Sequence, residues 1–427
     1  MTIAIMALGT RGDVQPYVAL AVGLQSAGHT VRVITHENYE RLVRAYGLEF
    51  WPVYGDVQAV AESPEIQALL EKGDFLAINA RTAKLAEQAS LSWAKDSLAA
   101  CRDAQLLVAG VGGLFLALAL AEKLNLPLMQ AYVFPFTPTR TFPAALFPKA
   151  WANLGGAANA FSHHTLRQIM WQGSRAADKV ARQQVLNLPA APFFGPYQSH
   201  RLNGHPVLYG ISPAVIAPPP DWQNTHVTGY WFLEAEPAWT PPAELERFLQ
   251  AGPPPVYVGF GSMSNRKPEQ TTELILHALR QTQQRAILLS GWNGLRKKNL
   301  PETVYLLDSA PHSWLFSRVA AVVHHGGAGT TAAGLRAGVP SIIIPFFADQ
   351  PFWGARVADL GVGPAPIPRP QLTAERLAQA LAQATTNRAL QQRAAQLGER
   401  IRAEDGVAQA VTVIDTVLSR SKSTVAA

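Results

Sequence analysis

Apolar, strand-like runs alternate with helical patterns along most of this 427-residue chain. In the first half, IAIMAL at residues 3–8 precedes an amphipathic stretch, VRVIT follows at 31–35, and QLLVAGV at 105–111 precedes a second helical stretch. Continuous apolar runs joined by helices are typical of parallel strands that are buried on both faces of a sheet. The alternation therefore predicts the α/β class with parallel sheets.

A proline-rich stretch from residue 212 to residue 242 interrupts this alternation, which then resumes with runs such as PVYVGFGS and AAVVHHGG. A chain of this length exceeds what one hydrophobic core usually serves, so two domains are expected. We expect two Rossmann-like domains whose parallel sheets face each other across a cleft. Their predicted bounds are an N-terminal domain over 1–220, an interdomain linker over 221–242 and a C-terminal domain over 243–427, with the last helix a candidate for packing back on the first domain.

The formal net charge of +6 favours anionic ligands or an anionic membrane surface, but Lys and Arg form no block that marks a nucleic-acid patch. The one cysteine, Cys101, excludes an internal disulfide and fits a reducing compartment. The N-terminus has no basic region before its apolar run, and the longest apolar run, 106–121, is short for a spanning helix. We therefore expect a cytoplasmic protein that binds no nucleic acid.

The most informative local motif is HHGGAGTT, residues 324–331, between a strand-like run and a helical pattern. Small residues let a backbone approach an oxygen-rich group, Thr hydroxyls can donate to it or cap the helix, and His can donate to phosphate oxygens. An ordinary strand-to-helix turn would use the same residue types. GFGSMS at 259–264 and FADQ at 347–350 end other strands of the same half and favour a diphosphate site.

These motifs, together with GTRGDVQPYVAL at residues 9–20, resemble the UDP-glycosyltransferase superfamily of GT-B fold, glycosyltransferase family 1. Within it, the chain is most similar to the sterol 3-beta-glucosyltransferases and to the glycosyltransferases of glycopeptide and macrolide biosynthesis. The resemblance covers about the first 35 residues and residues 256–362. It implies an acceptor-binding N-terminal domain and a nucleotide-sugar-binding C-terminal domain.

The resemblance also implies a set of donor-binding residues. His325 and the residues after it would hold the diphosphate together with Ser262, the Asp-Gln pair would bind sugar hydroxyls, and Ala310 and His312 would recognise base and ribose, with Trp292 as a wall for the base. The full set is Ser262, Trp292, Ala310, His312, His325, Gly327, Gly329, Thr330, Thr331, Asp349 and Gln350. Plant-type members have Trp where this chain has Ser309 and Glu where it has Ala333, which leaves UDP and TDP both open, with UDP-glucose favoured.

The resemblance further implies that Asp13 is the catalytic base, because the loop from Gly12 to Pro16 carries Asp where many members carry His. A general base that removes the acceptor proton contributes about 10²–10⁴-fold. The sequence contains no Asp-x-Asp motif, so no metal and no cofactor are expected, and helix N-termini and His325 would stabilise the leaving diphosphate. The implied reaction is inverting and metal-independent.

Other functions share part of this sequence pattern. A TDP-deoxysugar transferase is the nearest alternative, and a UDP-sugar epimerase or a non-catalytic GT-B protein shares the expected build. A dinucleotide-dependent oxidoreductase is disfavoured, because GTRGD lacks the Gly-x-Gly-x-x-Gly spacing.

The expected acceptor is a bulky apolar alcohol, such as a sterol, triterpenoid, polyketide or lipid. Aromatic residues gather in the N-terminal half, although core packing is the commoner fate of any one of them. The loop from 131 to 148 is rich in proline, and its aromatics need a partner, either the acceptor or a membrane surface. The residues proposed for the acceptor are Phe115, Tyr132, Phe134, Phe136 and Trp151.

Overall fold

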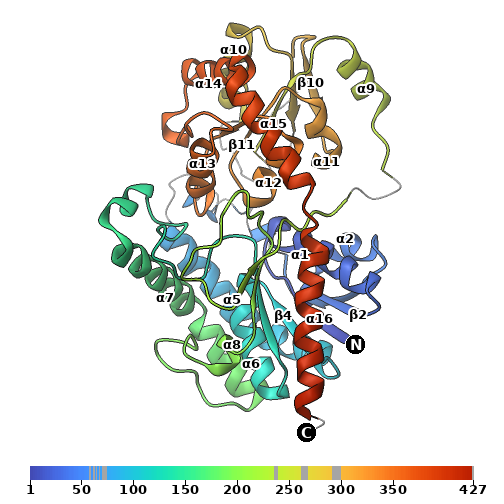
Figure 1. The fold of residues 1–427 in the computed structure, drawn as a ribbon, viewed down its shortest axis with the longest axis vertical. Helices are drawn as coiled ribbons and strands as arrows, with labels where there is room; N and C mark the ends of the chain where they lie inside the picture. Colours follow the sequence, from blue (N-terminus) through green and yellow to red (C-terminus); the bar gives the residue numbers. More distant parts are fainter. Residues whose placement is uncertain are drawn as a thin grey trace. The chain divides into compact units, whose positions relative to one another are not determined.

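The computed structural model divides the chain into two compact units (Figure 1). It describes residues 1–56, 59–60, 63, 65–66, 68–69, 75–234, 239–260, 268–290 and 300–425. The first unit comprises Met1–Val60, Leu76–Leu233 and Glu404–Ala427, and the second is built on Glu234–Ala403. The division falls at residue 233, inside the stretch expected as a linker, and the chain returns to the first unit at its C-terminal end.

The first unit contains a seven-stranded parallel sheet of order β3-β2-β1-β4-β5-β6-β7. Its strands are β1 (Thr2–Met6), β2 (Thr30–His36), β3 (Glu49–Val53), β4 (Leu106–Ala109), β5 (Leu128–Tyr132), β6 (Val207–Tyr209) and β7 (Thr225–Val227). Its helices are α1 (Arg11–Ser26), α2 (Glu40–Arg44), α5 (Phe75–Cys101), α6 (Leu114–Leu124), α7 (Gly156–Val180), α8 (His200–Asn203) and α16 (Gly406–Val425). The strand order reverses between β1 and β4, and such a switch point is where parallel α/β sheets bind ligands.

Strand β7 explains why the expected linker differs from the structure. It is a three-residue edge strand between prolines, too short to show a period, and it pairs with β6. Trp231, just beyond it, is 3% exposed, packs into the core of the first unit and donates from Nε1 to Thr228 Oγ1 at 3.0 Å. Residues 221–233 therefore belong to the first unit.

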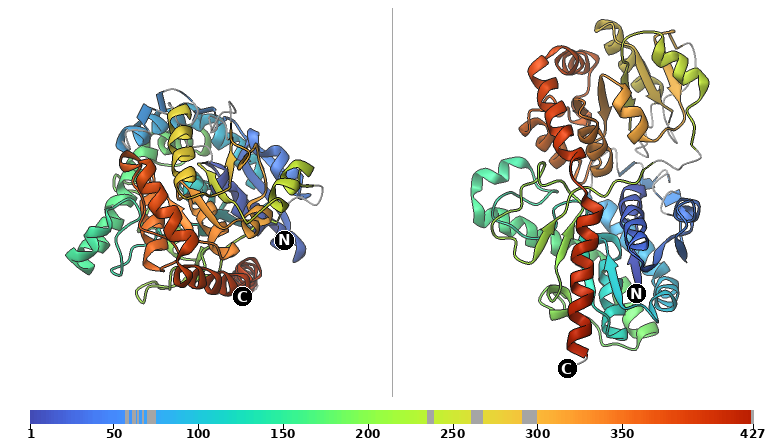
Figure 2. Two further views of the ribbon diagram at one scale, coloured as in Figure 1. Left: turned by 90° about the horizontal axis from the view of Figure 1, so that it is seen from above. Right: turned by 45° about the vertical axis from the view of Figure 1, so that its right-hand side comes forward.

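The last helix, α16, packs against α1 in the core of the first unit (Figures 1 and 2). Ala410 and Ile414 are fully buried there. A Cβ on Gly23 of α1 would lie 2.2 Å from Val407 Cγ1, so the two helices approach where α1 has no side chain. This close packing fixes the C-terminal segment on the unit that also contains β1.

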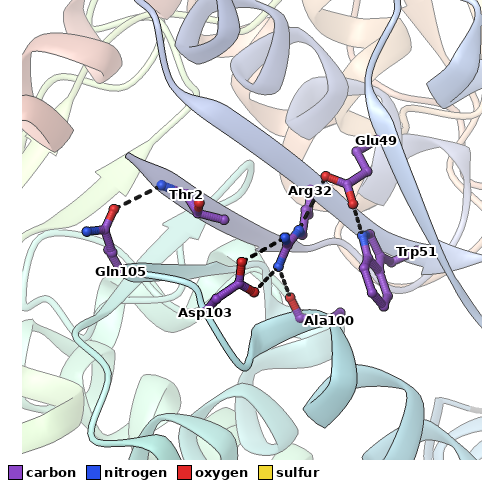
Figure 3. A network of polar contacts seen from close by, with 7 residues as sticks. All are labelled: Thr2, Arg32, Glu49, Trp51, Ala100, Asp103 and Gln105. Atoms are coloured by element: carbon purple, nitrogen blue, oxygen red, sulfur yellow. Dashed lines mark hydrogen bonds and ion pairs between the residues drawn. The ribbon is translucent and has the colours of Figure 1, made fainter.

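A polar network closes the opposite end of the first sheet, near the amino ends of β1 and β4 (Figure 3). The Arg32 guanidinium donates to both carboxylate oxygens of Asp103, to Glu49 Oε2 at 3.3 Å and to the Ala100 carbonyl at 3.1 Å. Glu49 in turn accepts from Trp51 Nε1 at 2.8 Å. Arg32 thus joins β2, β3 and the end of α5, and leaves the carboxyl edge of the sheet for other roles.

The second unit contains a five-stranded parallel sheet of order β10-β9-β8-β11-β12. Its strands are β8 (Val256–Gly259), β9 (Ala286–Leu289), β10 (Val304–Leu307), β11 (Ala321–His324) and β12 (Ser341–Ile343). Its helices are α9 (Ala243–Gln250), α10 (Pro268–Gln281), α11 (His312–Leu315), α12 (Ala328–Ala337), α13 (Gln350–Asp359), α14 (Ala374–Thr386) and α15 (Arg388–Arg402). The strand order reverses between β8 and β11, which places the loop after β11 at the switch point.

Both faces of this second sheet are buried, as its continuous apolar strands predict. Val258 of β8 and Val323 of β11 face a core cluster that includes residues of α10 and α14. Tyr257 and Val322, one position away on the same strands, face a separate cluster with residues of α9 and α11. The alternation follows from the two-residue period of a strand.

Candidate active site

The first unit offers Asp13 as a candidate catalytic residue, in the first turn of α1 after β1. Its Oδ2 atom accepts hydrogen bonds from the backbone N–H and from the hydroxyl of Thr10, both at 2.9 Å. The carboxylate thereby caps the start of α1. None of the described residues donates a hydrogen bond to Oδ1. One carboxylate oxygen is therefore anchored, and the other is available to a ligand.

Gly9 makes room for the Asp13 carboxylate. Its φ is +141°, a value that side-chain-bearing residues rarely adopt, and a Cβ built on it would lie 2.5 Å from Asp13 Oδ2. Leu8, just before this glycine, packs against the loop after β4, because a Cβ on Gly112 would lie 2.0 Å from the Leu8 carbonyl oxygen. The glycines therefore define where the carboxylate stands.

Burial raises the pKa of Asp13 above its usual range, against the two hydrogen bonds from Thr10, which lower it. Tyr17, one helical turn further on, donates its hydroxyl to the Ala131 carbonyl at 2.5 Å, and its own pKa is raised by burial and by the Asp13 charge. A carboxylate with a raised pKa accepts a proton more readily than one in water. The arrangement can act as a general base toward a hydroxyl group.

A second polar feature at this edge, which the sequence analysis did not single out, follows strand β2. Thr35 Oγ1 and His36 Nδ1 are buried and have no hydrogen-bond partner among the described residues. The pKa of His36 is lowered, mainly by burial, and the imidazole is therefore neutral at pH 7. Their signal in the sequence was two polar residues, Thr-His, ending an apolar strand on the side where ligands bind.

The second unit contains a candidate binding site of its own, the cradle, residues 324–331, between β11 and α12. His324 Nδ1 accepts the backbone N–H of Gly326 at 3.1 Å and so shapes the turn. Gly326 has a φ of +92°, and a Cβ there would lie 2.6 Å from Ile343 Cγ2. A residue with a side chain would strain this turn and push the cradle off β12.

His325 lies at the amino end of α12, because a Cβ on Gly327 would be 2.5 Å from its Nε2 atom. Burial lowers the pKa of His325 to about 4, so the ring is neutral at pH 7 and carries one N–H donor. His325 Nδ1 and Thr331 Oγ1 are buried with no hydrogen-bond partner among the described residues. The N-cap, Gly327, provides no side-chain cap, which leaves the first N–H groups of α12 for a ligand.

The Asp-Gln pair lies next to the cradle, since a Cβ on Gly326 would be 3.1 Å from the Gln350 carbonyl oxygen. Asp349, at the start of α13, accepts from Trp353 Nε1 at 2.8 Å through Oδ2. Gln350 is 4% exposed, and its Oε1 accepts from the backbone N–H groups of Phe346 and Phe347 at 2.8 and 3.2 Å. The Gln350 side chain therefore holds the loop in shape, while Asp349 is partly exposed.

The other residues predicted to bind the donor lie in different places. His312 begins α11 and stacks on Phe316, with ring centroids 4.4 Å apart and planes 15° apart. Ala310 precedes it and is partly exposed. Gly329 is exposed, and a Cβ on it would meet nothing within 4 Å, so the turn stays open there; Thr330 beside it is partly exposed. Ser262 and Trp292 lie outside the described residues.

The structure buries three of the five aromatic residues expected around the acceptor. Phe115, Tyr132 and Phe136 are 8%, 0% and 1% exposed. Phe115 packs edge-on against Trp171 at 5.1 Å between ring centroids, and Tyr132 packs against Phe136 at 5.2 Å. These rings form core packing, whereas Phe134 and Trp151 are partly exposed.

Within the described ranges, no three His, Cys, Asp or Glu side chains are grouped so that they could hold a metal ion. The same ranges contain no helix with the length and apolar character needed to cross a bilayer.

Two family models match this chain. The glycosyltransferase family 28 N-terminal domain matches residues 3–143, and the C-terminal domain of the erythromycin biosynthesis protein CIII-like family matches residues 273–414. The first match contains Asp13, and the second contains the cradle and the Asp-Gln pair.

Curated relatives extend over the whole chain. A sterol 3-beta-glucosyltransferase of Arabidopsis thaliana, UGT80A2, is 36% identical over 437 residues, which cover 100% of this chain and 67% of that protein. A second one, UGT80B1, is 37% identical and covers 96% of this chain and 67% of its own length. A sterol 3-beta-glucosyltransferase of Emericella nidulans is 37% identical, and this chain spans only 31% of its length.

Solved structures share the fold at lower identity. The glycosyltransferase of kitacinnamycin has a TM-score of 0.67 at 18% identity and covers 98% of this chain and 99% of its own. The glycosyltransferase VinC, solved in complex with DTDP, has a TM-score of 0.66 at 18% identity and covers 98% of this chain and 100% of its own. The two parallel sheets and these neighbours define a GT-B glycosyltransferase fold, which confirms the expected fold class. The chain belongs to the sterol 3-beta-glucosyltransferase family of the UDP-glycosyltransferase superfamily.

Proposed function

We propose that this protein transfers glucose from UDP-glucose to the hydroxyl of a bulky apolar alcohol of the sterol class. The observation that carries the proposal is the amino end of α12, where uncapped N–H groups lie beside two buried polar atoms, His325 Nδ1 and Thr331 Oγ1, that have no hydrogen-bond partner among the described residues. Burying such groups without partners is unfavourable, so a ligand rich in acceptor oxygens is the natural occupant. A diphosphate has that chemistry.

In this proposal Asp13 is the general base. Thr10 holds Oδ2, and Oδ1 accepts the proton of the acceptor hydroxyl as its oxygen attacks the anomeric carbon. The bond from that carbon to the diphosphate breaks in the same step, so the configuration at the anomeric carbon inverts. No covalent intermediate forms on the protein.

The leaving diphosphate is stabilised without a metal. The α12 terminus offers about half a positive charge, and His325 adds one N–H donor. Because burial keeps His325 neutral, its contribution is a hydrogen bond rather than a charge. Asp349, at the adjoining loop, binds hydroxyls of the transferred sugar. Ala310 and His312 stand where the nucleoside is bound, with His312 stacked on Phe316.

The names of the relatives support glucose and a sterol over a deoxysugar and a polyketide. Phe134 and Trp151 are the two aromatic side chains retained as acceptor candidates, because both are partly exposed. A sterol dissolves in membranes, so we also propose a peripheral contact with a membrane surface.

Purified protein incubated with UDP-glucose and a panel of alcohols, with mass spectrometry of the products, tests this function. Sterols should gain one hexose with higher kcat/KM than sugars or amino acids, TDP-glucose should be a poorer donor, and excess chelator should leave the rate unchanged. The product should be the β-glucoside by NMR, since the donor is the α-anomer. Transfer that requires Mg²⁺ or Mn²⁺, or retains the α-configuration, contradicts the mechanism.

A further inference from the structure

Two consecutive phenylalanines on the first unit stand largely in solvent. Phe193 and Phe194, in the loop between residues 187 and 199, are 56% and 72% exposed. Phe161 on α7 is 62% exposed. Phe161 lies on the helix face that carries His164 and Gln168, three and seven residues further on. Large apolar side chains gathered in this way mark a contact surface.

The loop that carries the two phenylalanines is held firmly by its backbone. The Phe193 carbonyl accepts from Trp171 Nε1 at 2.8 Å and from Gln172 Nε2 at 2.9 Å, and the Phe194 carbonyl accepts from Gln168 Nε2 at 2.7 Å. Gly195, with a φ of +85°, packs its Cα against the Trp171 ring. Three side-chain donors of α7 thus fix the main chain while both aromatic rings stay exposed.

The net positive charge of the protein resides in this part of the chain. Residues 124–220 contain seven Lys or Arg against a single acid, Asp178, a net charge of +6, which equals the formal net charge of the whole chain. The rest of the chain therefore contains equal numbers of basic and acidic residues. The basic residues are Arg140, Lys149, Arg167, Arg175, Lys179, Arg182 and Arg201.

A cavity of about 630 Å³ adjoins the exposed phenylalanines, which form part of its lining with His164, Arg167 and Tyr197. The Arg167 guanidinium lies 5.4 Å from the Phe136 ring centroid and 5.2 Å from that of Tyr197, and its Nε donates to the Phe136 carbonyl at 3.3 Å. Within the described part of the chain, Arg167 makes no ion pair. Arg182, which also lines the cavity, is paired with Glu122 at 2.8 Å.

A positively charged side chain also lies next to one of the exposed phenylalanines. The Arg175 guanidinium lies 4.4 Å from the Phe193 ring centroid, and Arg175 is exposed. Aromatic rings beside unpaired guanidinium groups suit the interface of an anionic bilayer, where rings enter the headgroup boundary and cations meet phosphates. A surface of this kind, with few acids, offers little negative charge to a basic partner.

We propose that Phe161, Phe193, Phe194, Arg167 and Arg175 form a docking surface for an anionic lipid bilayer. The two loop phenylalanines enter the interface, and the guanidinium of Arg167, at the cavity, binds a lipid phosphate. The proposal deepens the peripheral membrane contact of the proposed function, but it does not depend on the transfer chemistry.

Co-sedimentation of the full chain with vesicles tests this surface. The protein should bind vesicles of phosphatidylcholine mixed with phosphatidylglycerol, bind phosphatidylcholine alone poorly, and lose binding as salt rises. Replacing both phenylalanines, Phe193→Ser with Phe194→Ser, should weaken binding at least about tenfold, because the variant lacks the two rings that enter the bilayer. Arg175→Gln should weaken it about threefold or more.

Matched variants separate this surface from general effects. Leu76→Ser removes an apolar side chain of similar exposure on α5, and Arg388→Gln removes an exposed charge of the second unit; both should bind as the wild type does. Unchanged thermal unfolding shows that the serine variant is folded, and unchanged transfer to a detergent-dispersed sterol shows that its active site is intact. Failure of every protein to transfer glucose refutes the proposed function without touching the vesicle result.

Three outcomes overturn the docking surface. The double serine variant binds the mixed vesicles as tightly as the wild type does, or the wild type does not bind them at all. The third is a wild-type dimer in light scattering that becomes a monomer in the double serine variant, because the phenylalanines would then cover a second copy of the chain.

Discussion

Replacing Gly9 by Ala should disable the active site without touching any residue that does chemistry. A Cβ at this position would lie 2.5 Å from Asp13 Oδ2 and 2.8 Å from Asp13 Cβ, so the carboxylate must move. Moving it breaks both hydrogen bonds from Thr10. The φ of +141° adds backbone strain for any residue with a side chain.

The expected cost follows from these contacts. Backbone strain of this kind costs about 1–3 kcal/mol. The lost hydrogen bonds to a charged group cost roughly 1.5–3 kcal/mol each, less what water restores at a partly exposed site. We expect the free energy of unfolding to fall by about 2–4 kcal/mol. Displacing a catalytic group by about 1 Å can cost about a hundredfold in rate, so kcat should fall by that order.

Urea unfolding and initial rates of transfer measure the two effects, and Gly12→Ala is the matched control. A Cβ on Gly12 would meet only Thr10 Oγ1, at 3.8 Å, so that variant should keep both stability and rate. Combining Gly9→Ala with Asp13→Asn should slow transfer no further than Asp13→Asn alone, because both changes remove the same base. Wild-type kcat in a folded Gly9→Ala protein, or additive effects in the double variant, would refute this reasoning.

Three further predictions concern other parts of the molecule. His325→Ala should weaken UDP binding by calorimetry and lower kcat by about 10²-fold or more, since it removes a donor to the developing charge on the diphosphate; an equal kcat would contradict this role. Asp178→Asn should stabilise the protein at pH 7 by up to about 3 kcal/mol. Burial raises the pKa of Asp178 to about 6 from 3.8, so the folded state holds the proton more tightly and stability falls as pH rises through that window; the gain should vanish below about pH 4, and a variant equally stable at both pH values would contradict the shift. Arg32→Met should lower stability in urea by more than the roughly 0.5 kcal/mol of an exposed helical pair, for which Arg44→Met is the control; equal effects would mean that the network of Figure 3 adds nothing.

The sequence predicted the fold, and it placed the candidate residues at the ends of strands, because both depend on local patterns. Continuous apolar runs specify buried parallel strands, and polar residues after β1 and β11 must lie at the carboxyl edges of their sheets. The glycines of the cradle and of the Gly9 loop also follow from their motifs, since each allows a close approach that a Cβ would block.

Other features depend on packing that no pattern in one sequence records. Phe115 and Tyr132 have the same residue types as a pocket wall, yet the structure packs them against Trp171 and Phe136. Gln350 is predicted to bind the sugar, and the sequence gives no sign that its side-chain oxygen accepts two backbone N–H groups of its own loop. The excess of positive charge in residues 124–220 does not appear as a run of Lys and Arg, because it arises from a scarcity of acidic residues.

The central claim, that Asp13 is the general base, is tested most directly by Asp13→Asn assayed for both UDP-glucose transfer and UDP binding. The amide keeps the shape of the side chain and can still accept from Thr10 through its oxygen, but it cannot take up the proton of the acceptor hydroxyl. Transfer should fall at least about a hundredfold while the Kd for UDP stays within about twofold of the wild type. A variant that retains more than about a tenth of the wild-type kcat would contradict the account and place the base elsewhere.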